Sequence, residues 1–244
     1  MYIVLITIHI FQMSDVLDLI LEKKPDWIFH QDEEQRNPLH WAASMGYLEG
    51  VRHLLGKNPS TAMERDKNGF FPIHMASAKG HVHVIQELLQ PWPYVEEMQN
   101  SEGQNILHVA AASGKLNVIK YILETPGLKS LINERDKDGN TPLHLATKHW
   151  HPKLVSALTW DNKVDLRLVN NDGLTALDIA ECYIENSSTF RQVCLSKRNL
   201  LSNCFYHQIH NNKHIFGIFK KRVPSVQYIS SNMEIYHLEP IVMS

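Results

Sequence analysis

TPLHLAT, at residues 141–147, is the stretch that decides the fold, because close copies of it recur along the chain at an almost constant interval. The other copies are NPLHWAA at 37–43, FPIHMAS at 71–77, NILHVAA at 105–111 and a degenerate TALDIAE at 175–181. Their fourth position steps by 34, 34, 36 and 34 residues through His40, His74, His108, His144 and Asp178. A turn glycine precedes four of the copies in the same phase, at Gly69, Gly103, Gly139 and Gly173. Self-similarity at this period indicates a stack of small units that pack only on their neighbours.

The string and its period resemble the ankyrin repeat, whose signature is T-P-L-H-x-A. The resemblance covers residues 14–186. It implies an all-α fold, an ankyrin-repeat solenoid of stacked helix–turn–helix units with short β-turn fingers. We expect about four to five repeats plus a partial N-terminal one. The expected boundaries are 14–31 (partial), 32–65, 66–99, 100–135, 136–169 and 170–186 (partial).

The unit that begins at Asp136 shows how a repeat is expected to fold. The stretch DKDG, at 136–139, has the composition of a turn. Thr141 offers a hydroxyl as a helix N-cap, and Pro142 suits the first helical position, where no N–H is needed. The second helices carry apolar residues one turn apart, a stripe that buries itself only when the copies stack. These residues are Val51 with Leu54 and Leu55, Val84 and Ile85 with Leu88 and Leu89, and Val118 and Ile119 with Ile122 and Leu123.

Two positions depart from the pattern. Gly46, Gly80 and Gly114 are expected to end first helices in the left-handed conformation, but Trp150 stands at that place in the unit 136–169. We therefore expect the second helix of that unit to start late, with Trp150 either covering an apolar surface or pointing outward. Gln35 stands where the other units have the turn glycine, so we expect the first finger to be distorted.

The two ends of the chain differ from the repeats. Residues 1–13 form an aberrant or truncated apolar start, for which a processed or anchoring role is the alternative. Residues 187–244 form a basic, irregular tail that we expect to be poorly ordered. The tail carries seven Lys/Arg and two Asp/Glu, a net +5, which leaves −7 for residues 1–186 out of the total of −2. Nucleic-acid binding needs basic residues on the folded part, so this distribution argues against that partner.

Membrane and redox signals are weak. No apolar run reaches the eighteen or so residues that a spanning helix needs. The cysteines are Cys182, Cys194 and Cys204, an odd number without a CxxC pair, which favours a reducing compartment. We therefore expect a cytoplasmic protein, and the cytosolic face of a membrane is the variant of that expectation.

The fifteen histidines invite a metal or catalytic interpretation. The resemblance implies instead that His40, His74, His108 and His144 hydrogen-bond backbone between units, and that the four turn glycines are structural. His81 and His83 follow Gly80 at the start of a second helix, where a ligand role is the alternative. In the tail, Cys204, His207, His210 and His214 have ligand types that suit zinc but match no common zinc spacing; a solvated stretch is the simpler interpretation. No phosphate loop, nucleophile elbow or HExxH string occurs. We expect no catalytic, cofactor-binding or metal-binding residues, and no enzyme.

The remaining surface is the candidate binding face. The resemblance implies that a protein partner is held by the finger tips and by the exposed side of the first helices. An apolar anchor and cationic side chains at these positions would suit a partner with an acidic rim. The proposed partner-binding residues are Arg36, Met45, Phe70, Lys79, Gln104, Ser113, Asn140, Lys148 and His149, of which Lys79, Lys148 and His149 are expected to be cationic.

The amino-acid sequence of several stretches narrows the resemblance to one group of ankyrin proteins. NERDKDGNTPLHLA, QNILHVAAASGKLNVIKYIL and ILEKKPD are similar to plant ankyrin proteins with a carboxy-terminal PGG membrane domain, which are implicated in defence, cell death and salt stress. Neither a PGG string nor a spanning segment follows Ile184 here. The resemblance implies a protein–protein interaction module, a scaffold or adaptor in plant defence or stress signalling. The alternative is a membrane-associated signalling protein or transport regulator. The partner is a protein of unknown identity or a full-length ankyrin relative, and contact of Phe219–Arg222 with acidic lipid remains open.

Overall fold

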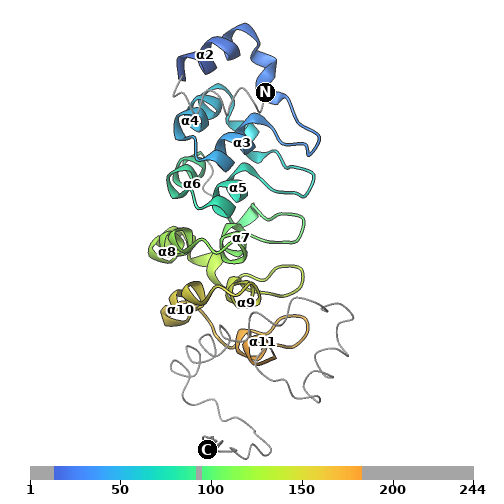
Figure 1. Cartoon of the computed structure of the whole chain (residues 1–244), viewed down its shortest axis with the longest axis vertical. Helices are drawn as coiled ribbons and strands as arrows, with labels where there is room; N and C mark the ends of the chain where they lie inside the picture. The colour runs from blue at the N-terminus through green and yellow to red at the C-terminus, as the bar shows by residue number, and fades with distance from the viewer. Residues whose placement is uncertain (1–13, 92–94, 183–244) are drawn as a thin grey trace, which may run out of the picture.

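The computed structural model describes residues 14–91 and 95–182, which form a stack of helix pairs (Figure 1). The first helices are α3 (Pro38–Met45), α5 (Pro72–Lys79), α7 (Ile106–Ala112), α9 (Pro142–Lys148) and α11 (Ala176–Cys182). The second helices are α4 (Leu48–Lys57), α6 (Val82–Leu89), α8 (Leu116–Glu124) and α10 (Pro152–Trp160), and α2 (Ser14–Lys23) lies at the N-terminal end. Short 3-10 helices follow α2, α4, α6 and α8: η1 (Pro25–Phe29), η2 (Pro59–Met63), η3 (Val95–Glu97) and η4 (Pro126–Asn133).

The stacking confirms the predicted fold class. Figure 1 shows the first helices in one column and the second helices in another. Each first helix from α3 to α9 contacts the next first helix and its own second helix. The described residues contain one isolated β-bridge, between Val169 and Thr175, and no strand. The architecture is therefore an all-α solenoid of helix–turn–helix units.

The core is continuous along the stack, as the apolar stripes predicted. The stripe residues of the second helices are fully or almost fully buried, apart from Leu89, which is partly buried. They join the alanines of the first helices in one cluster that runs from α2 to α11. Since burial of a branched aliphatic side chain contributes about 1.5–3 kcal/mol, the stack is stabilised mainly by these contacts between neighbouring units.

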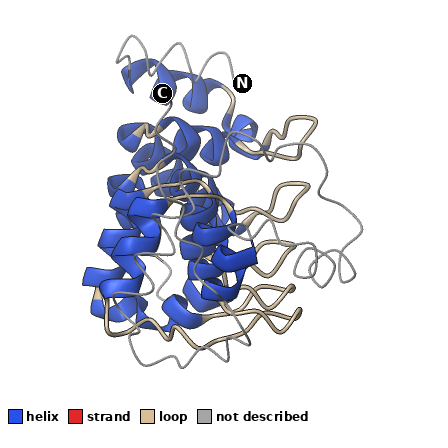
Figure 2. Cartoon of the chain, turned by 60° about the horizontal axis from the view of Figure 1, so that its bottom comes forward, coloured by secondary structure: helices blue, strands red, loops and turns tan. Residues whose placement is uncertain are grey.

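The fingers project from one side of the helical stack and lie beside one another (Figure 2). One backbone hydrogen bond joins each finger to the next. Its N···O distance is between 2.9 and 3.3 Å at four joints, where the donors Lys67, Ser101, Lys137 and Asn171 face the carbonyls of Glu34, Asn68, Glu102 and Asp138. The fingers are thus fixed relative to one another as well as to the helices.

The first helices start where the sequence predicts, but the capping hydrogen bonds at their starts match the prediction only in part. Pro142 begins α9, as expected. The Thr141 hydroxyl does not cap the backbone of α9, because it lies 2.7 Å from His144 Nδ1 instead. Asn105 is the better cap: its Oδ1 accepts the N–H groups of Leu107 and His108 at 2.9 and 3.0 Å.

The expected late start of α10 is wrong. Gly46, Gly80 and Gly114 have positive φ as predicted, and Trp150 adopts the same conformation with φ 62°. α10 then begins two residues after Trp150, the same offset at which α4 follows Gly46. Trp150 is partly buried and packs against the core. Its packing therefore holds a backbone conformation that costs an L-residue about 1–2 kcal/mol.

The expected distortion of the first finger is also wrong. Gln35 adopts φ 60°, and its N–H donates to the Asp32 carbonyl at 2.9 Å. The same bond in the next finger runs from Gly69 to Asp66 at 2.8 Å. The turn keeps its geometry because the Asp32 carboxylate also accepts the N–H groups of Glu34 and Arg36, each at 2.9 Å.

The exact limits of the repeats remain predictions. The helices and fingers follow the expected phase of the units from 32 onward, and α2 occupies the partial N-terminal unit. Predictions for residues 1–13 and 187–244, including the possible zinc ligands and Phe219–Arg222, lie outside the described residues.

Candidate functional site

The repeat histidines form a series of cross-links between neighbouring units. Each ring accepts, at Nδ1, the backbone N–H of the residue three positions before it; for His74 the donor is Phe71 at 3.1 Å. The Nε2 atom must then carry the ring proton of the neutral imidazole, and it faces a finger carbonyl of the next unit. These Nε2···O distances are 2.9–3.1 Å, for His40 to Phe70, His74 to Gln104, His108 to Asn140 and His144 to Leu174. This geometry is the inter-unit role that the resemblance implied.

Burial keeps these rings neutral. Desolvation lowers the pKa of His74 and of His108 from 6.5 to about 4, although the carbonyl bonds oppose the shift. Desolvation also lowers the pKa of His40 and His144. A neutral ring with both nitrogens engaged in backbone bonds has no free lone pair for a metal. The described residues contain no group of three or more His, Cys, Asp or Glu side chains that could hold a metal ion.

Asp178 occupies the histidine position in the last described unit. Its Oδ2 accepts from the N–H and the hydroxyl of Thr175 at 2.7 and 2.6 Å. The carboxylate therefore replaces Nδ1 as the acceptor at the helix start, but an ionised carboxylate has no proton to donate onward.

The turn glycines are structural, for two reasons that Gly139 illustrates. Its φ is 76°, a conformation that glycine adopts without the penalty of a Cβ. A Cβ at this position would also lie 2.7 Å from the backbone nitrogen of Asn171 in the next finger. Neighbouring fingers can therefore approach one another at Gly69, Gly103 and Gly139 because these positions carry no side chain, whereas no atom of the described residues lies within 4 Å of a Cβ at Gly173.

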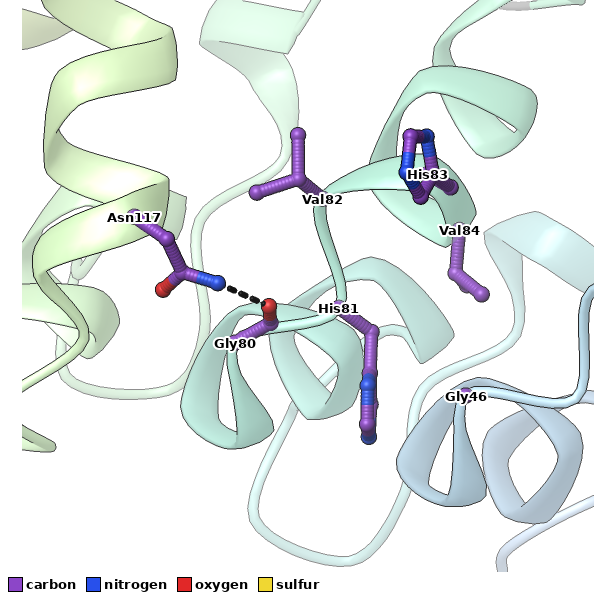
Figure 3. Close-up of a pocket in the computed structure, with 7 residues that line it drawn as sticks. All are labelled: Gly46, Gly80, His81, Val82, His83, Val84 and Asn117. Carbon is purple, nitrogen blue, oxygen red and sulfur yellow. Dashed lines mark hydrogen bonds between the residues drawn. The ribbon is translucent and has the colours of Figure 1, made fainter.

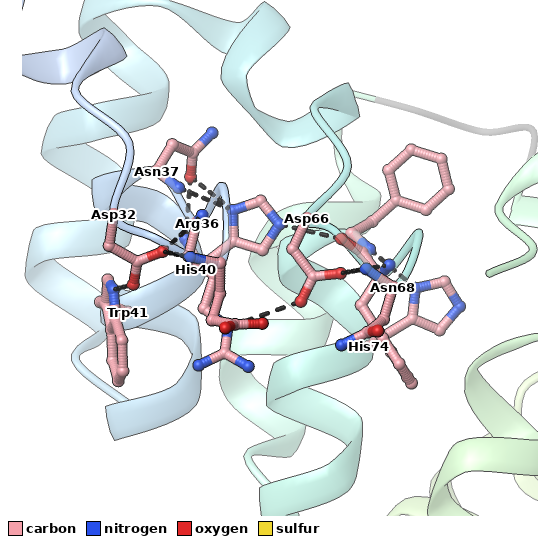
Figure 4. Close-up of polar contacts among 11 residues, drawn as sticks. Asp32, Arg36, Asn37, His40, Trp41, Asp66, Asn68 and His74 are labelled. Atoms are coloured by element: carbon pink, nitrogen blue, oxygen red, sulfur yellow. Dashed lines mark hydrogen bonds and ion pairs between the residues drawn. The ribbon is translucent and has the colours of Figure 1, made fainter. Parts of the chain in front are cut away.

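A cluster of charged and aromatic side chains lies at the first two fingers (Figure 4). The Trp41 indole N–H donates to Asp32 Oδ2 at 2.9 Å, and the guanidinium of Arg36 lies 5.4 Å from the Trp41 ring centroid. Arg36 also pairs with Asp66 at 3.5 Å. Trp41 was not among the residues predicted from the sequence. The sequence could have indicated Trp41, because this residue directly follows His40 in the repeat string and lies in the same unit as Asp32 and Arg36.

The predicted partner-binding residues differ in their exposure. Lys79 and His149 are exposed, and six more are partly buried: Arg36, Met45, Phe70, Gln104, Ser113 and Lys148. Phe70 packs edge-to-face on His74, with ring centroids 5.7 Å apart. These eight side chains are all accessible to a partner, and their role in binding remains a proposal.

Asn140 does not fit the predicted face. Its exposed fraction is 2%, and its N–H donates to Asp136 Oδ1 at 2.7 Å. Its side-chain oxygen accepts from Asn170 of the next finger at 3.1 Å. The next finger covers Asn140, so this residue links fingers and is left out of the proposed face.

His149 is exposed but is not the cation that we expected. Partial burial, followed by the charge of Lys148 and the proximity of His151, lowers its pKa from 6.5. The ring is therefore neutral at neutral pH, and it can offer hydrogen bonds but no charge to a partner.

The comparisons with known proteins agree with this geometry. Three family models match the chain: "Ankyrin repeats (3 copies)" at residues 58–129, "Ankyrin repeats (many copies)" at 107–160 and "Ankyrin repeat" at 34–64. Together the models cover residues 34–160, which contain four of the cross-linked first helices.

Two curated relatives are similar to parts of the chain. Protein ACCELERATED CELL DEATH 6 of Arabidopsis thaliana is 44% identical over 177 residues, which are 72% of this chain and 26% of that protein. Protein phosphatase 1 regulatory subunit 12A of Rattus norvegicus is 37% identical over 70 residues, 29% of this chain and 6% of that protein. The chain thus spans about a quarter of the length of the Arabidopsis protein that it matches. In the described residues, no helix has the length and apolar character needed to cross a bilayer.

Proposed function

Because the chain belongs to the ankyrin-repeat family, we propose that it is a non-catalytic scaffold or adaptor that binds a protein partner through its finger face. The finger face is defined here as Arg36, Trp41, Met45, Phe70, Lys79, Gln104, Ser113, Lys148 and His149. The family is one of protein-interaction modules, and the described residues hold no metal-binding cluster.

The observation that carries the proposal is the ordered aromatic and cationic cluster at the first two fingers. Asp32 and Asp66 hold Trp41 and Arg36 in place, so a partner would meet side chains that have already lost their conformational freedom. Preorganised Trp and Arg side chains are common centres of binding energy in protein interfaces. Phe70 of the next finger adds a partly exposed ring beside this cluster.

The cellular setting is proposed from the relatives. The name of the Arabidopsis protein refers to cell death, and its similarity extends over 72% of this chain. This supports a role in plant defence or stress signalling, in the cytoplasm or at the cytosolic face of a membrane.

The test is affinity capture from plant tissue with a double variant, Phe70→Ala with Lys148→Glu. The matched control is Phe29→Ala with Lys120→Glu, which makes the same chemical changes at exposed sites away from the finger face. We expect the wild type and the control to retain a common set of proteins that the finger-face variant loses, while all three melt at nearly the same temperature. If all three capture the same proteins, the finger face is not the binding surface.

A further inference from the structure

The turns that follow α5, α7 and α9 form a continuous surface at the C-terminal ends of these helices, and it shares Lys79, Ser113, Lys148 and His149 with the finger face. We call it the turn edge and define it as residues 79–83, 113–117 and 148–153. Neighbouring turns are tied together: His81 Nε2 lies 3.1 Å from the carbonyl of Ser44, and His151 Nε2 lies 3.1 Å from that of Ala112. Between them, the Asn117 amide donates to the Gly80 carbonyl (Figure 3).

The net charge of the turn edge is positive and comes from its four lysines. Eight of its sixteen residues are lysine or histidine and none is acidic, and these eight are Lys79, His81, His83, Lys115, Lys148, His149, His151 and Lys153. The adjoining acids Glu49 and Glu87, on α4 and α6, both bind Arg52 at 2.9 Å. Since residues 1–186 carry a net charge of −7, the edge is an area of opposite sign on an acidic body.

Helix stability explains only half of these lysines. Lys79 and Lys148 lie in the last turns of α5 and α9, where a cation is favourable to the helix dipole. Lys115 is the N-cap residue of α8, and Lys153 lies in the first turn of α10, where a cation is unfavourable. Charges placed against a local rule are expected at functional sites, so Lys115 and Lys153 point to a ligand rather than to the fold.

The chemistry of the edge favours a diffuse anionic surface. Lysine is a point charge without the planar fork with which arginine recognises individual carboxylates, and the edge contains no arginine. The large exposed apolar side chains of the described residues are Leu19, Phe29, Trp160 and Val169, and none of them lies on the edge. Contact would therefore be electrostatic and shallow, without insertion into the acyl region.

An open hollow of about 370 Å³ lies at the first of the three turns of the edge. It is lined by Gly46, residues 80–84 and Asn117. A Cβ on Gly80 would lie 3.4 Å from Lys115 Cδ, so the stem of Lys115 crosses the groove beside the hollow. The hollow gives room for a headgroup beside Lys115.

We propose that the turn edge docks on the phosphate headgroups of an anionic lipid bilayer. The first helices begin at the fingers and end at the turn edge, so docking would leave Arg36, Trp41, Phe70 and Gln104 of the finger face free for a protein partner and would cover the four residues that both surfaces share. The contact goes beyond the proposed function and does not depend on it.

The experiment is co-sedimentation of the full chain with phosphatidylcholine vesicles, with and without phosphatidylserine. We expect binding only to the anionic vesicles, and weaker binding at high salt because salt screens the lysines. The variant Lys115→Gln with Lys153→Gln should lower the partition coefficient by roughly 25-fold, since each lysine near an anionic surface contributes about 1 kcal/mol. Its melting temperature should stay equal or rise, because both charges oppose a helix dipole.

Two controls separate the edge from other cations. Lys67→Gln with Lys137→Gln removes the same charge from exposed finger tips and should change the partition coefficient less than the edge variant. All measurements are repeated in a Lys220→Gln, Lys221→Gln, Arg222→Gln background, which removes the basic run of the tail. The proposal is overturned if the edge variant binds like the finger-tip variant, or if the tail background alone abolishes binding. Binding to poly-glutamate but not to anionic vesicles would also overturn it, in favour of an acidic protein.

Discussion

Acidification should destabilise the solenoid well before its carboxylates titrate, because the cross-linking histidines are native only as neutral rings. The pKa of His74 and His108 is about 4 in the folded chain and 6.5 as the ordinary value. Between these values the unfolded chain binds protons that the folded chain does not, so the free energy of unfolding falls as pH falls. The contribution of each ring is complete above pH 6.5 and is lost progressively down to about pH 4.

The magnitude follows from these two pKa values. At about pH 5.5, one pH unit below the unfolded pKa, protonation stabilises the unfolded chain by about 1.4 kcal/mol for each ring. His74 and His108 together therefore cost about 3 kcal/mol of stability relative to about pH 7.5. The lowered pKa values of His40, His144 and His149 act in the same direction. Burial raises the pKa of Glu134 above 4.5, so on acidification the folded chain takes up this proton before the unfolded chain does, an effect of opposite sign that sets in above pH 4.5; the comparison therefore stops at about pH 5.5.

The assay is urea unfolding followed by far-ultraviolet circular dichroism at the two pH values. A loss of about 3 kcal/mol moves the midpoint down by about 1–2 M urea. His74→Gln, which cannot titrate, should be less stable at neutral pH but should lose about 1.4 kcal/mol less on acidification. An equal acid loss in His74→Gln and wild type would refute the reasoning, as would a wild-type midpoint that does not move.

Two further predictions concern backbone conformation. Gln35→Gly should stabilise the chain by about 0.5–1 kcal/mol, because the strain of a non-glycine residue at φ 60° is larger than the entropy cost of glycine in the unfolded chain. A lower urea midpoint would show that the contacts of the Gln35 side chain contribute more than this strain costs. Gly139→Ala should destabilise by about 2 kcal/mol or more through its φ and the close Asn171 nitrogen. Gly127→Ala, where no atom lies within 4 Å of the new Cβ, should change the melting temperature little, and equal effects of the two alanines would contradict the role of the finger contact.

The sequence was sufficient for the fold because the pattern repeats. Each copy of the string places a proline or equivalent at the helix start and a small residue where neighbouring helices meet. Because the copies agree, they remove the ambiguity of secondary structure that a single segment would leave. The departures were harder to interpret. A missing glycine at Gln35 or Trp150 is visible in the sequence, but the hydrogen bonds and packing that hold the same conformation without it are not.

The binding face was less predictable than the fold, since exposure depends on the neighbouring unit. Asn140 occupies the same finger position as Phe70, yet Asn170 of the next finger covers it. His149 was assigned a charge from its residue type, whereas its surroundings lower its pKa. Trp41 became a candidate only when its bond to Asp32 and its contact with Arg36 were known.

Asp178 ends the series of links that the repeat histidines make between units. Every repeat-histidine link is donated by one unit and received by the carbonyl of the unit after it, whereas His81 and His151 donate to carbonyls of the unit before. Among the described residues the series of repeat-histidine links stops at the unit that contains Asp178. Through the repeat histidines, each unit accepts a hydrogen bond from the unit before it. Removing one of these histidines leaves the histidine bonds of the other units intact. Amide exchange should report this as a gradient, with the slowest protons in α7 and the fastest in α11. In α11, Asp178 occupies the position of the repeat histidine, and its carboxylate donates no hydrogen bond to a further unit.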